Sequence, residues 1–264
     1  MKKYLITIFV FLILVALLFN ITEVQVFDET LNVPISGVKV NNFLTNEQGV
    51  SKFLDISFNQ FITLERIGYQ TTKVKIGIKP LYRVAKVNLS EADSNYIREQ
   101  INNWENGISN YRYELTTSKT DYSYTFIQVI NGDDKYTKTI TNQNGQITET
   151  EIFVISGRVY IRENGGQIQE ITENKEDFIS NNLILIPLAD VINEFFSAIN
   201  GNVVFESPSK LIFASNNAQS VLTLILSNEG TPSKFILENS NQNSKEVITL
   251  TIDLSSTEVS FSEK

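Results

Sequence analysis

The chain has 264 residues, enough for one large or two ordinary domains. Hydrophobic residues make up 42% and charged residues 20%, which is the balance of a folded globular protein. With 22 basic against 30 acidic side chains, the net charge is −8, so a nucleic-acid partner, which needs a basic surface, is not expected. The sequence has no cysteine and no histidine, which excludes disulfides, thiolate or imidazole metal sites and histidine-based catalysis.

The first residues combine two lysines with a long apolar run. Lys2 and Lys3 precede the segment 4–19, in which Thr7 is the clearly polar residue. Roughly 16 residues at ~1.5 Å per residue extend about 24 Å, a little less than the ~30 Å hydrocarbon core of a bilayer. Because lysines stay on the cytoplasmic side, we expect residues 1–21 to be a transmembrane signal anchor, with the bulk of the chain in the periplasm or at the cell surface. A cleaved signal peptide is the alternative, although residues 17–21 lack the small side chains that cleavage prefers.

Residues 22–89 alternate short apolar strands with turn signals. Strands are expected around Val24, Val38, residues 50–54, 58–66, Val74 and residues 82–89. Turns about every 8–12 residues between such strands favour a small β-sandwich. The join to the next domain is expected between Leu89 and Ser90, without a flexible linker, because no run of glycine and serine occurs there.

Three short motifs occur in this segment in a fixed order: Pro34-Ile35-Ser36-Gly37-Val38, then Thr45 with Gly49, then Gly68-Tyr69. In this order they resemble the carboxypeptidase regulatory-like family, and the resemblance covers most of residues 22–89. It implies a transthyretin-like sandwich without catalytic residues of its own, used as a spacer or for interactions. Some members of that family form internal cross-links between lysine and asparagine, for which Lys39 and Asn88 are the candidates. An exposed strand lysine is the plainer interpretation of Lys39.

A first helix is predicted over residues ~91–106. Ser90 is expected to be its N-cap, with Asp93 three residues later in a variant of the capping box. Apolar residues recur at helical spacing at Ile97, Ile101 and Trp104. Trp104 is interpreted as the apolar contact of this helix with a sheet rather than as a ring that stacks on a ligand.

The stretch from Asn110 to Ile171 is predicted to be a ladder of antiparallel strands. Aromatic and apolar residues alternate there with hydroxyl and charged residues, which is the period of a half-buried strand. The gaps between the strands carry Asn131-Gly132, Asn144-Gly145, Ser156-Gly157 and Asn164-Gly165. Asn-Gly supplies the positive φ that a type I′ turn requires, so each such gap is expected to be a tight reversal. We expect the resulting curved meander to turn its aromatic rings to one inner face.

Beyond the ladder, residues 173–182 are mostly polar and are expected to form a loop. A second helix is predicted over ~187–200, with Pro187 in its first turn and an apolar stripe that includes Phe195 and Phe196. Further strands are expected at Val203–Glu206, Leu211–Ala214, Val221–Leu226, Phe235–Leu237 and Val247–Leu254. The strand Val221–Leu226 is apolar on both faces, so a central position in the sheet is expected.

Two short motifs accompany this order of helix, meander, helix and strands: Asn110-Tyr111-Arg112-Tyr113 and Gly230-Thr231-Pro232-Ser233-Lys234-Phe235. Together they resemble the lipoprotein-carrier superfamily, LolA-like and LppX-like, over residues ~91–254. The resemblance implies a curved antiparallel half-barrel that wraps around helices and leaves a hollow for acyl chains. The expected fold is therefore mainly β (α+β), with a membrane helix (1–21), a β-sandwich (22–89) and a half-barrel packed with two helices (90–264). The carriers of that superfamily are free in the periplasm or lipid-anchored, so an uncleaved anchor and a fused sandwich argue against shuttling between membranes.

The aromatic inner face is the feature that points to a function. Its candidate ligand-binding residues are Tyr111, Tyr113, Tyr122, Tyr124, Phe126, Tyr136, Phe195 and Phe196. A hollow lined by tyrosines suits a lipid or another apolar ligand, because their polar tips tolerate a partly wet pocket. The alternative is that the second helix fills the concavity and leaves an ordinary core. In that case the chain would be a structural or protein-interaction module of the cell envelope.

No catalytic constellation emerges from the sequence, and an enzyme is not expected. Glu149 and Glu151 share a strand face like the paired carboxylates of a glycosidase, but a solvated face fits their threonine-rich surroundings better. Asp133-Asp134 lacks the acidic alternation of a calcium loop and fits a hairpin tip. No cofactor or metal is expected. The expected partners are the membrane, a lipid or another apolar small molecule, and envelope proteins.

Overall fold

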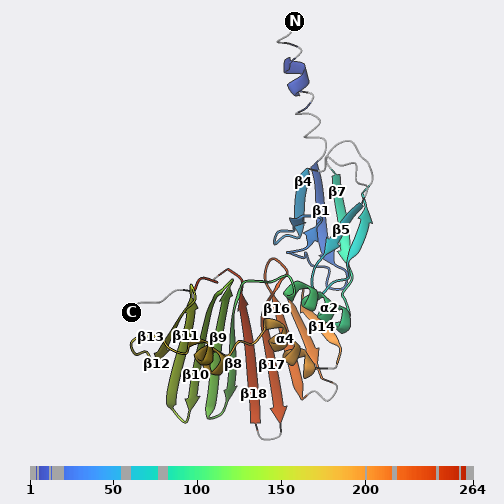
Figure 1. Cartoon of the computed structure of the whole chain (residues 1–264). Helices are drawn as coiled ribbons and strands as arrows, with labels where there is room; N and C mark the ends of the chain where they lie inside the picture. The colour runs from blue at the N-terminus through green and yellow to red at the C-terminus, as the bar shows by residue number, and fades with distance from the viewer. Residues whose placement is uncertain are drawn as a thin grey trace. The chain divides into compact units, whose positions relative to one another are not determined.

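The computed structural model of the chain describes residues 4, 6–11, 13, 21–54, 61–76, 83–199, 201–215, 219–241, 244–255 and 257–259. The chain divides into two compact units (Figure 1). Unit 1 consists of residues 1–97 with 205–209 and 226–231, and unit 2 consists of residues 98–204, 210–225 and 232–264. The prediction of a mainly β chain with large antiparallel sheets is confirmed.

The predicted transmembrane anchor, residues 1–21, lies mostly outside the described residues. Of this segment, residues 4, 6–11 and 13 are helical, and residue 21 begins a strand. Within the described part of the chain, no helix combines the length and the apolar character needed to cross a membrane. The anchor therefore stays a prediction from the sequence.

Unit 1 contains two small sheets. One has three strands in the order β4-β1-β7, formed by Val50–Leu54, Ile21–Asp28 and Arg83–Leu89. The other has four strands in the order β3-β2-β5-β6, formed by Phe43–Leu44, Lys39–Val40, Phe61–Glu65 and Thr72–Lys75. Their alternating apolar residues are buried, among them Val24, Val26, Val40, Ile62 and Leu64. The predicted strands are thus found, while residues 58–60 and 82 of two of them lie outside the described residues.

A buried polar contact fixes the turn after β1. The hydroxyl of Tyr69, which is fully buried, donates a hydrogen bond to Oδ2 of Asp28 at 2.6 Å. Oδ1 of Asp28 accepts the backbone N–H groups of Thr30 and Leu31 at 2.8 and 2.7 Å. The tyrosine of the Gly68-Tyr69 motif is therefore a core residue that satisfies a buried carboxylate. Lys39 is exposed on β2, as the plainer interpretation of this residue predicted.

The first predicted helix is found as α2, Ser94–Glu105, with Ile97 and Ile101 fully buried and Trp104 partly buried. The prediction that Ser90 caps it is wrong. Oδ1 of Asp93 accepts the backbone N–H groups of residues 95 and 96 at 3.0 and 2.9 Å, so Asp93 is the capping residue. The hydroxyl of Ser90 instead donates to the carboxylate of Glu29.

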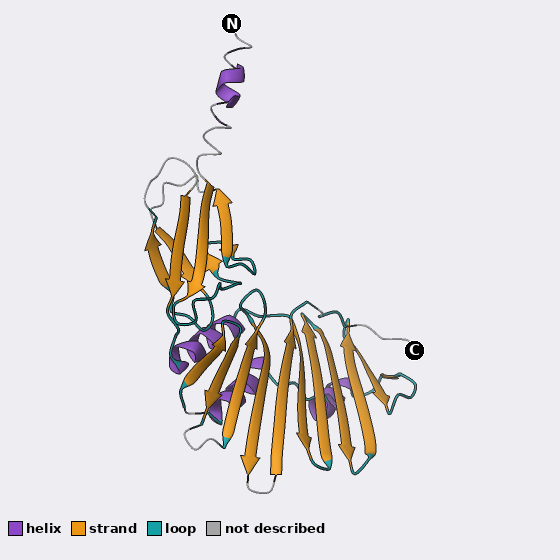
Figure 2. Cartoon of the chain, turned by 180° about the vertical axis from the view of Figure 1, so that it is seen from behind, coloured by secondary structure: helices purple, strands orange, loops and turns teal. Residues whose placement is uncertain are grey.

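Unit 2 is built on a sheet of eleven strands, in the order β13-β12-β11-β10-β9-β8-β18-β17-β16-β15-β14. Its first six strands along the chain are β8 Tyr111–Lys119, β9 Tyr122–Asn131, β10 Asp134–Gln143, β11 Gln146–Ile155, β12 Arg158–Glu163 and β13 Gln169–Ile171. The others are β14 Val203–Ser207, β15 Lys210–Ala214, β16 Ser220–Leu226, β17 Pro232–Asn241 and β18 Ser244–Asp253. The helices α3, Lys175–Asn182, and α4, Leu188–Ser197, lie on one face of this sheet (Figure 1). In the view from behind, the sheet lies in front of these helices (Figure 2).

Helix α4 lies within the predicted range and packs its apolar stripe on the sheet. The ring of Phe195 lies 6.0 Å from that of Phe235, and the ring of Phe196 lies 5.5 Å from that of Phe213, both edge-on. Burial of such rings is the main source of stability for a helix of this length.

The segment 173–182, predicted as a loop, contains helix α3. Its sequence is polar and no side chain caps its first turn, so its own helix propensity is weak. Phe178 and Ile179 pack against a cluster that includes Ile152 and Val159 of the sheet. This tertiary contact, which the local pattern does not show, stabilises the helix.

Three of the four predicted glycine turns have the expected geometry. Both central residues have a positive φ at Asn144-Gly145, Ser156-Gly157 and Asn164-Gly165. At the fourth, Asn131 is the last residue of β9, and the turn consists of Gly132 and Asp133, of which the glycine alone has a positive φ, +59°. That pattern is typical of a type II′ rather than a type I′ turn.

Strand β16 was expected to be central and apolar on both faces. It does lie inside the sheet, between β15 and β17, but it is third from the edge strand β14, and β8 occupies the middle position. Its buried residues Leu222, Leu224 and Leu226 alternate with half-buried ones, so one face of the strand is in the core and the other is not. The expectation of two buried faces is wrong, because the helices cover one face of the sheet.

Candidate functional site

The strand register divides the predicted aromatic residues between the two faces of the unit 2 sheet. On β8 and β9, Tyr113 pairs with Gln128 and Leu115 pairs with Phe126. Between β9 and β10, Val129 pairs with Tyr136. Paired residues project to the same face of a sheet, so Tyr136 lies on the other face from Tyr113 and Phe126. The prediction that all these rings share one inner face is therefore wrong for Tyr136.

We call the face that carries Tyr113, Phe126 and Leu250 the helix face, and the face that carries Arg112, Val129 and Tyr136 the open face. On the helix face, Tyr113 and Phe126 are 0% and 1% exposed, with ring centroids 6.0 Å apart. The Tyr113 hydroxyl and Nε2 of Gln128 both donate to the carbonyl of Ile186 at 2.9 Å. Oε1 of Gln128 accepts the N–H of Ile186, also at 2.9 Å. These bonds hold the segment between α3 and α4 against the sheet.

The remaining predicted residues of the helix face differ in their exposure. Phe195 and Phe196 are buried against the rings of the sheet. Tyr111 and Tyr124 are half-buried, and Tyr122 is 37% exposed. The buried rings fit the alternative of a filled core, and whether the partly exposed tyrosines hold a ligand stays a prediction.

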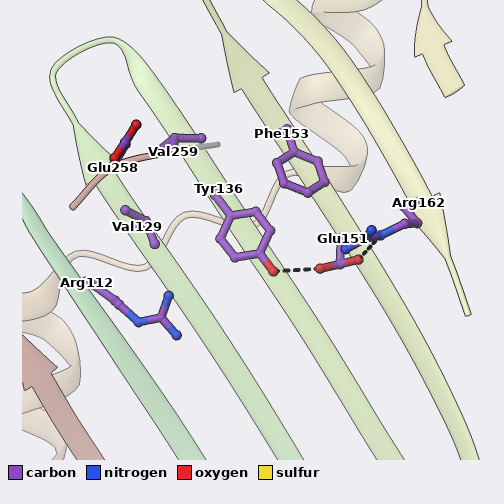
Figure 3. Close-up of a pocket in the computed structure, with 8 residues that line it drawn as sticks. All are labelled: Arg112, Val129, Tyr136, Glu151, Phe153, Arg162, Glu258 and Val259. Carbon is purple, nitrogen blue, oxygen red and sulfur yellow. Dashed lines mark hydrogen bonds and ion pairs between the residues drawn. The ribbon is translucent and has the colours of Figure 1, made fainter. Parts of the chain in front are cut away.

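The open face carries a pocket of about 220 Å³ (Figure 3). Its lining residues are Arg112, Val129, Tyr136, Glu151, Phe153, Arg162, Glu258 and Val259. Four of them, Arg112, Val129, Tyr136 and Phe153, form one cross-strand row over β8 to β11. Glu151 and Arg162 are paired in the neighbouring row, on β11 and β12. Six of the lining side chains therefore stand on strands of one sheet, which fixes their spacing.

A buried carboxylate organises the pocket. Glu151 is 2% exposed, and its Oε1 accepts the hydroxyl of Tyr136 at 2.8 Å. Its Oε2 accepts a hydrogen bond from the Nε–H of Arg162, and Nζ of Lys138 lies 3.6 Å from Oε1. Figure 3 shows the contacts of Glu151 with Tyr136 and Arg162. Lys138 also forms an ion pair with Glu149 at 2.7 Å. The charge of Glu151 is thus compensated by two cations and one phenol.

The electrostatics keep Glu151 ionised and Tyr136 protonated. Burial favours a higher pKa for Glu151, but hydrogen bonds from Arg162 and Tyr136 and the charge of Lys138 outweigh it and lower the pKa. The pKa of Tyr136 is raised by burial, by its hydrogen bond to Glu151 and by the negative charge of that carboxylate. The charges of Arg112 and Arg162 act on the pKa of Tyr136 in the opposite direction but do not cancel the increase.

Arg112 differs from the other cations of this region. It stands on β8 and lines the pocket, yet among the described residues no hydrogen bond or ion pair engages its guanidinium. Its side chain is partly buried, whereas the carboxylate of Glu258, contributed by the last described segment, is exposed. A guanidinium stays charged at every physiological pH, so the pocket contains one cation that is available to a ligand.

The candidates for metal or acid–base chemistry are not supported by this geometry. Within the described ranges, no group of three or more Asp or Glu side chains could hold a metal ion. Oδ1 of Asp134 accepts the N–H of Ser156 at 2.8 Å, as expected of a residue at a hairpin. Glu149 and Glu151 are bridged by Lys138, and the lowered pKa of Glu151 is the opposite of what a general acid requires.

The sequence predicts Tyr136 as a lining residue but does not single out Arg112 or Arg162. The prediction that Glu151 lies on a solvated face is wrong, because its side chain is 2% exposed and is bonded to Tyr136 and Arg162. The sequence could have predicted that these residues share a face, because a two-residue hairpin loop pairs even-numbered residues of one strand with odd-numbered residues of the next. The contribution of Glu258 and Val259 has no such local signal. A scan against protein-family models and a search among curated proteins both returned no match.

Proposed function

We propose that this chain is a membrane-anchored, non-enzymatic protein of the cell envelope that binds a small ligand on the open face of its large sheet. The apolar run behind Lys2 and Lys3 supports the anchor, with the bulk of the chain outside the cytoplasm. The resemblance of residues 22–89 to the carboxypeptidase regulatory-like family suggests that unit 1 serves as a spacer between the anchor and unit 2.

The single observation that carries the ligand site is the pocket with Arg112, for which the described part of the chain provides no ion-pair partner. Its polar groups converge from neighbouring strands, and most are already fixed by one another around Glu151. Preorganised polar groups in a concave site are the general mark of a binding pocket. At about 220 Å³ the space is below the ~300–1,000 Å³ of drug-sized sites, so it suits a small molecule or one chemical group of a larger one.

The same groups argue against catalysis. Both oxygens of Glu151 are engaged, and the proton of Tyr136 is held by that carboxylate. With no histidine or cysteine in the chain, imidazole bases and thiol nucleophiles are missing from this site.

A second candidate function is the binding of a lipid or another apolar ligand on the helix face, as the resemblance to lipoprotein carriers suggests. The observation in its favour is the partial exposure of Tyr111, Tyr122 and Tyr124 at the side of this face that is not buried. These three rings have the polar tips and apolar bodies of an amphipathic lining.

Native mass spectrometry of the full-length chain, released from detergent, tests the proposal. We expect a co-purified or added small polar compound to bind with one-to-one stoichiometry, and a fluorescent acyl probe not to bind. A retained lipid mass together with uptake of the acyl probe would instead favour the second candidate. A chain that binds neither class of compound contradicts both.

The location is tested separately by adding protease to intact cells and to inverted membrane vesicles. We expect unit 2 to be cut from the outer side only and to remain with the membrane fraction before cutting. Protection from outside and digestion from the cytoplasmic side would contradict the proposed orientation.

A further inference from the structure

We infer that the pocket on the open face selects a small carboxylate that also carries a hydroxyl or amine donor, with Arg112 as the residue that binds the carboxylate. This inference rests on the proposed function in taking the pocket as a ligand site.

The charges around the pocket leave one cation for the ligand. Arg162 is paired with Glu151, and Lys138 is paired with Glu149. Arg112 has no such partner among the described residues, and the carboxylate of Glu258, which also lines the pocket, is exposed. A partly buried guanidinium gains more from an anionic ligand than an exposed one does, because less water competes for its N–H groups.

The number and shape of the free donors favour a carboxylate. One free guanidinium balances one negative charge, and its planar pair of N–H groups matches the two oxygens of a carboxylate. A phosphate dianion would need a second cation whose charge is not already paired, and the charge of Arg162, the other cation of the lining, is paired with Glu151.

The hydroxyl of Tyr136 adds a second requirement for the ligand. Its hydroxyl proton is donated to Glu151, so its oxygen offers a lone pair and no proton to the pocket. A ligand group in contact with this oxygen must therefore be a donor, which a hydroxyl or an amine provides. The rings of Tyr136 and Phe153, whose centroids are 4.8 Å apart, and the side chain of Val129 form the smaller, apolar part of a mainly polar lining.

The size of the pocket limits the body of the ligand. A volume of about 220 Å³ is below the ~300–1,000 Å³ of drug-sized sites, so it admits a compact acid but not a long acyl chain. Mandelate has the required carboxylate, hydroxyl and compact ring, so it is a suitable probe.

Isothermal titration calorimetry on the full-length chain in detergent, with four matched probes, tests the inference. The probes are mandelate, mandelamide, phenylacetate and inorganic phosphate. We expect mandelate to bind at least ten-fold more tightly than mandelamide, which lacks the charge, and several-fold more tightly than phenylacetate, which lacks the hydroxyl. Phosphate should bind more weakly than mandelate.

Two variants identify the residue responsible. Arg112→Gln should weaken mandelate binding at least ten-fold and leave mandelamide unchanged, and Arg112→Lys should restore part of the affinity. Arg158→Gln is the matched control, since Arg158 is an exposed arginine on β12 of the same sheet outside the pocket lining. Equal binding of mandelate and mandelamide, tighter binding of phosphate, or unchanged binding in Arg112→Gln would overturn the inference.

The same titrations separate this inference from the proposed function. If neutral polar compounds bind while carboxylates do not, the pocket is a ligand site and the inference about Arg112 is wrong. If none of the four probes and no neutral sugar binds, the small-ligand proposal fails together with it.

Discussion

The two faces of the unit 2 sheet are made from alternate residues of the same strands, yet they serve opposite purposes. The helix face buries Phe126, Phe213 and Phe235 under α4 and the segment before it. The open face buries Glu151 and surrounds it with Lys138, Arg162 and Tyr136. The helix face carries most of the aromatic rings predicted to line a pocket, but the open face carries Arg112, a cation without an ion pair among the described residues. In this sheet, aromatic content marks the core and unpaired charge marks the candidate site.

The largest difference between the faces is expected for truncation of an apolar side chain. Phe235→Ala on the helix face should lower the free energy of unfolding by about 3–5 kcal/mol, because Phe235 is fully buried against Phe195 and Phe196. Ile147→Ala on the open face should change it by less than about 0.5 kcal/mol, because Ile147 is 65% exposed. Denaturant unfolding of both variants measures the difference, and a loss below about 1 kcal/mol for Phe235→Ala would show that this face is not tightly packed.

A smaller effect is expected when the buried carboxylate of the open face is neutralised. Glu151→Gln removes the charge that compensates Arg162 and accepts the Tyr136 proton, which should cost about 2–3 kcal/mol of unfolding free energy. Glu149→Gln is the matched control, and its more exposed ion pair with Lys138 should be worth less than about 1 kcal/mol. Equal losses in the two variants would contradict the central role of Glu151.

Removal of single hydroxyl groups compares the two faces directly. Tyr136→Phe should cost about 1.5–3 kcal/mol, since the acceptor of its hydrogen bond is the charged Glu151. Tyr113→Phe should cost about 0.5–1.5 kcal/mol, since its acceptor, the carbonyl of Ile186, is neutral and keeps the bond from Gln128. Chemical denaturation gives both values, and the reverse order would mean that the ion network of the open face adds little.

The smallest effect is a dependence on pH that only the open face should show. The pKa of Glu151 is lowered below its ordinary value of 4.5 in the folded chain, so its contribution is present above that value and is lost as the pH falls through the folded-state pKa. The stability difference between the wild type and Glu151→Gln should therefore be constant near neutrality and shrink below pH ~4.5. Urea unfolding from pH 7 to pH 2 tests this, and a difference that grows on acidification would mean that the pKa is raised.

Much of the fold could be predicted because strands and tight turns are local. Strand β4 coincides with the predicted residues 50–54, and all four glycine turns reverse the chain, three of them with the expected positive φ at both central residues. Helix α3 could not be predicted, since it depends on Ile152 and Val159, which precede it by some twenty residues in the chain. The N-cap of α2 was misplaced because Ser90 and Asp93 are both good capping residues and only the course of the chain decides between them.

The candidate site was predictable in part. The alternation of residues predicts the two faces of each strand, but it does not by itself show that Tyr136 shares a face with Arg112 rather than with Tyr113. Counting residues across the two-residue loops would have placed Arg112, Val129, Tyr136 and Phe153 on one face. The contribution of Glu258 and Val259 required the structure, since no local pattern ties the end of the chain to this face.

The most direct test of the central claim is a ¹⁹F NMR titration of the full-length chain with 3-fluorotyrosine at its tyrosines. The resonances of Tyr136, on the open face, and of Tyr122, on the helix face, are assigned from the single Tyr→Phe variants. With the open face as the ligand site, a small polar ligand should shift the Tyr136 resonance in a saturable way and leave the Tyr122 resonance in place. A saturable shift of Tyr122 with no change at Tyr136 would contradict the account.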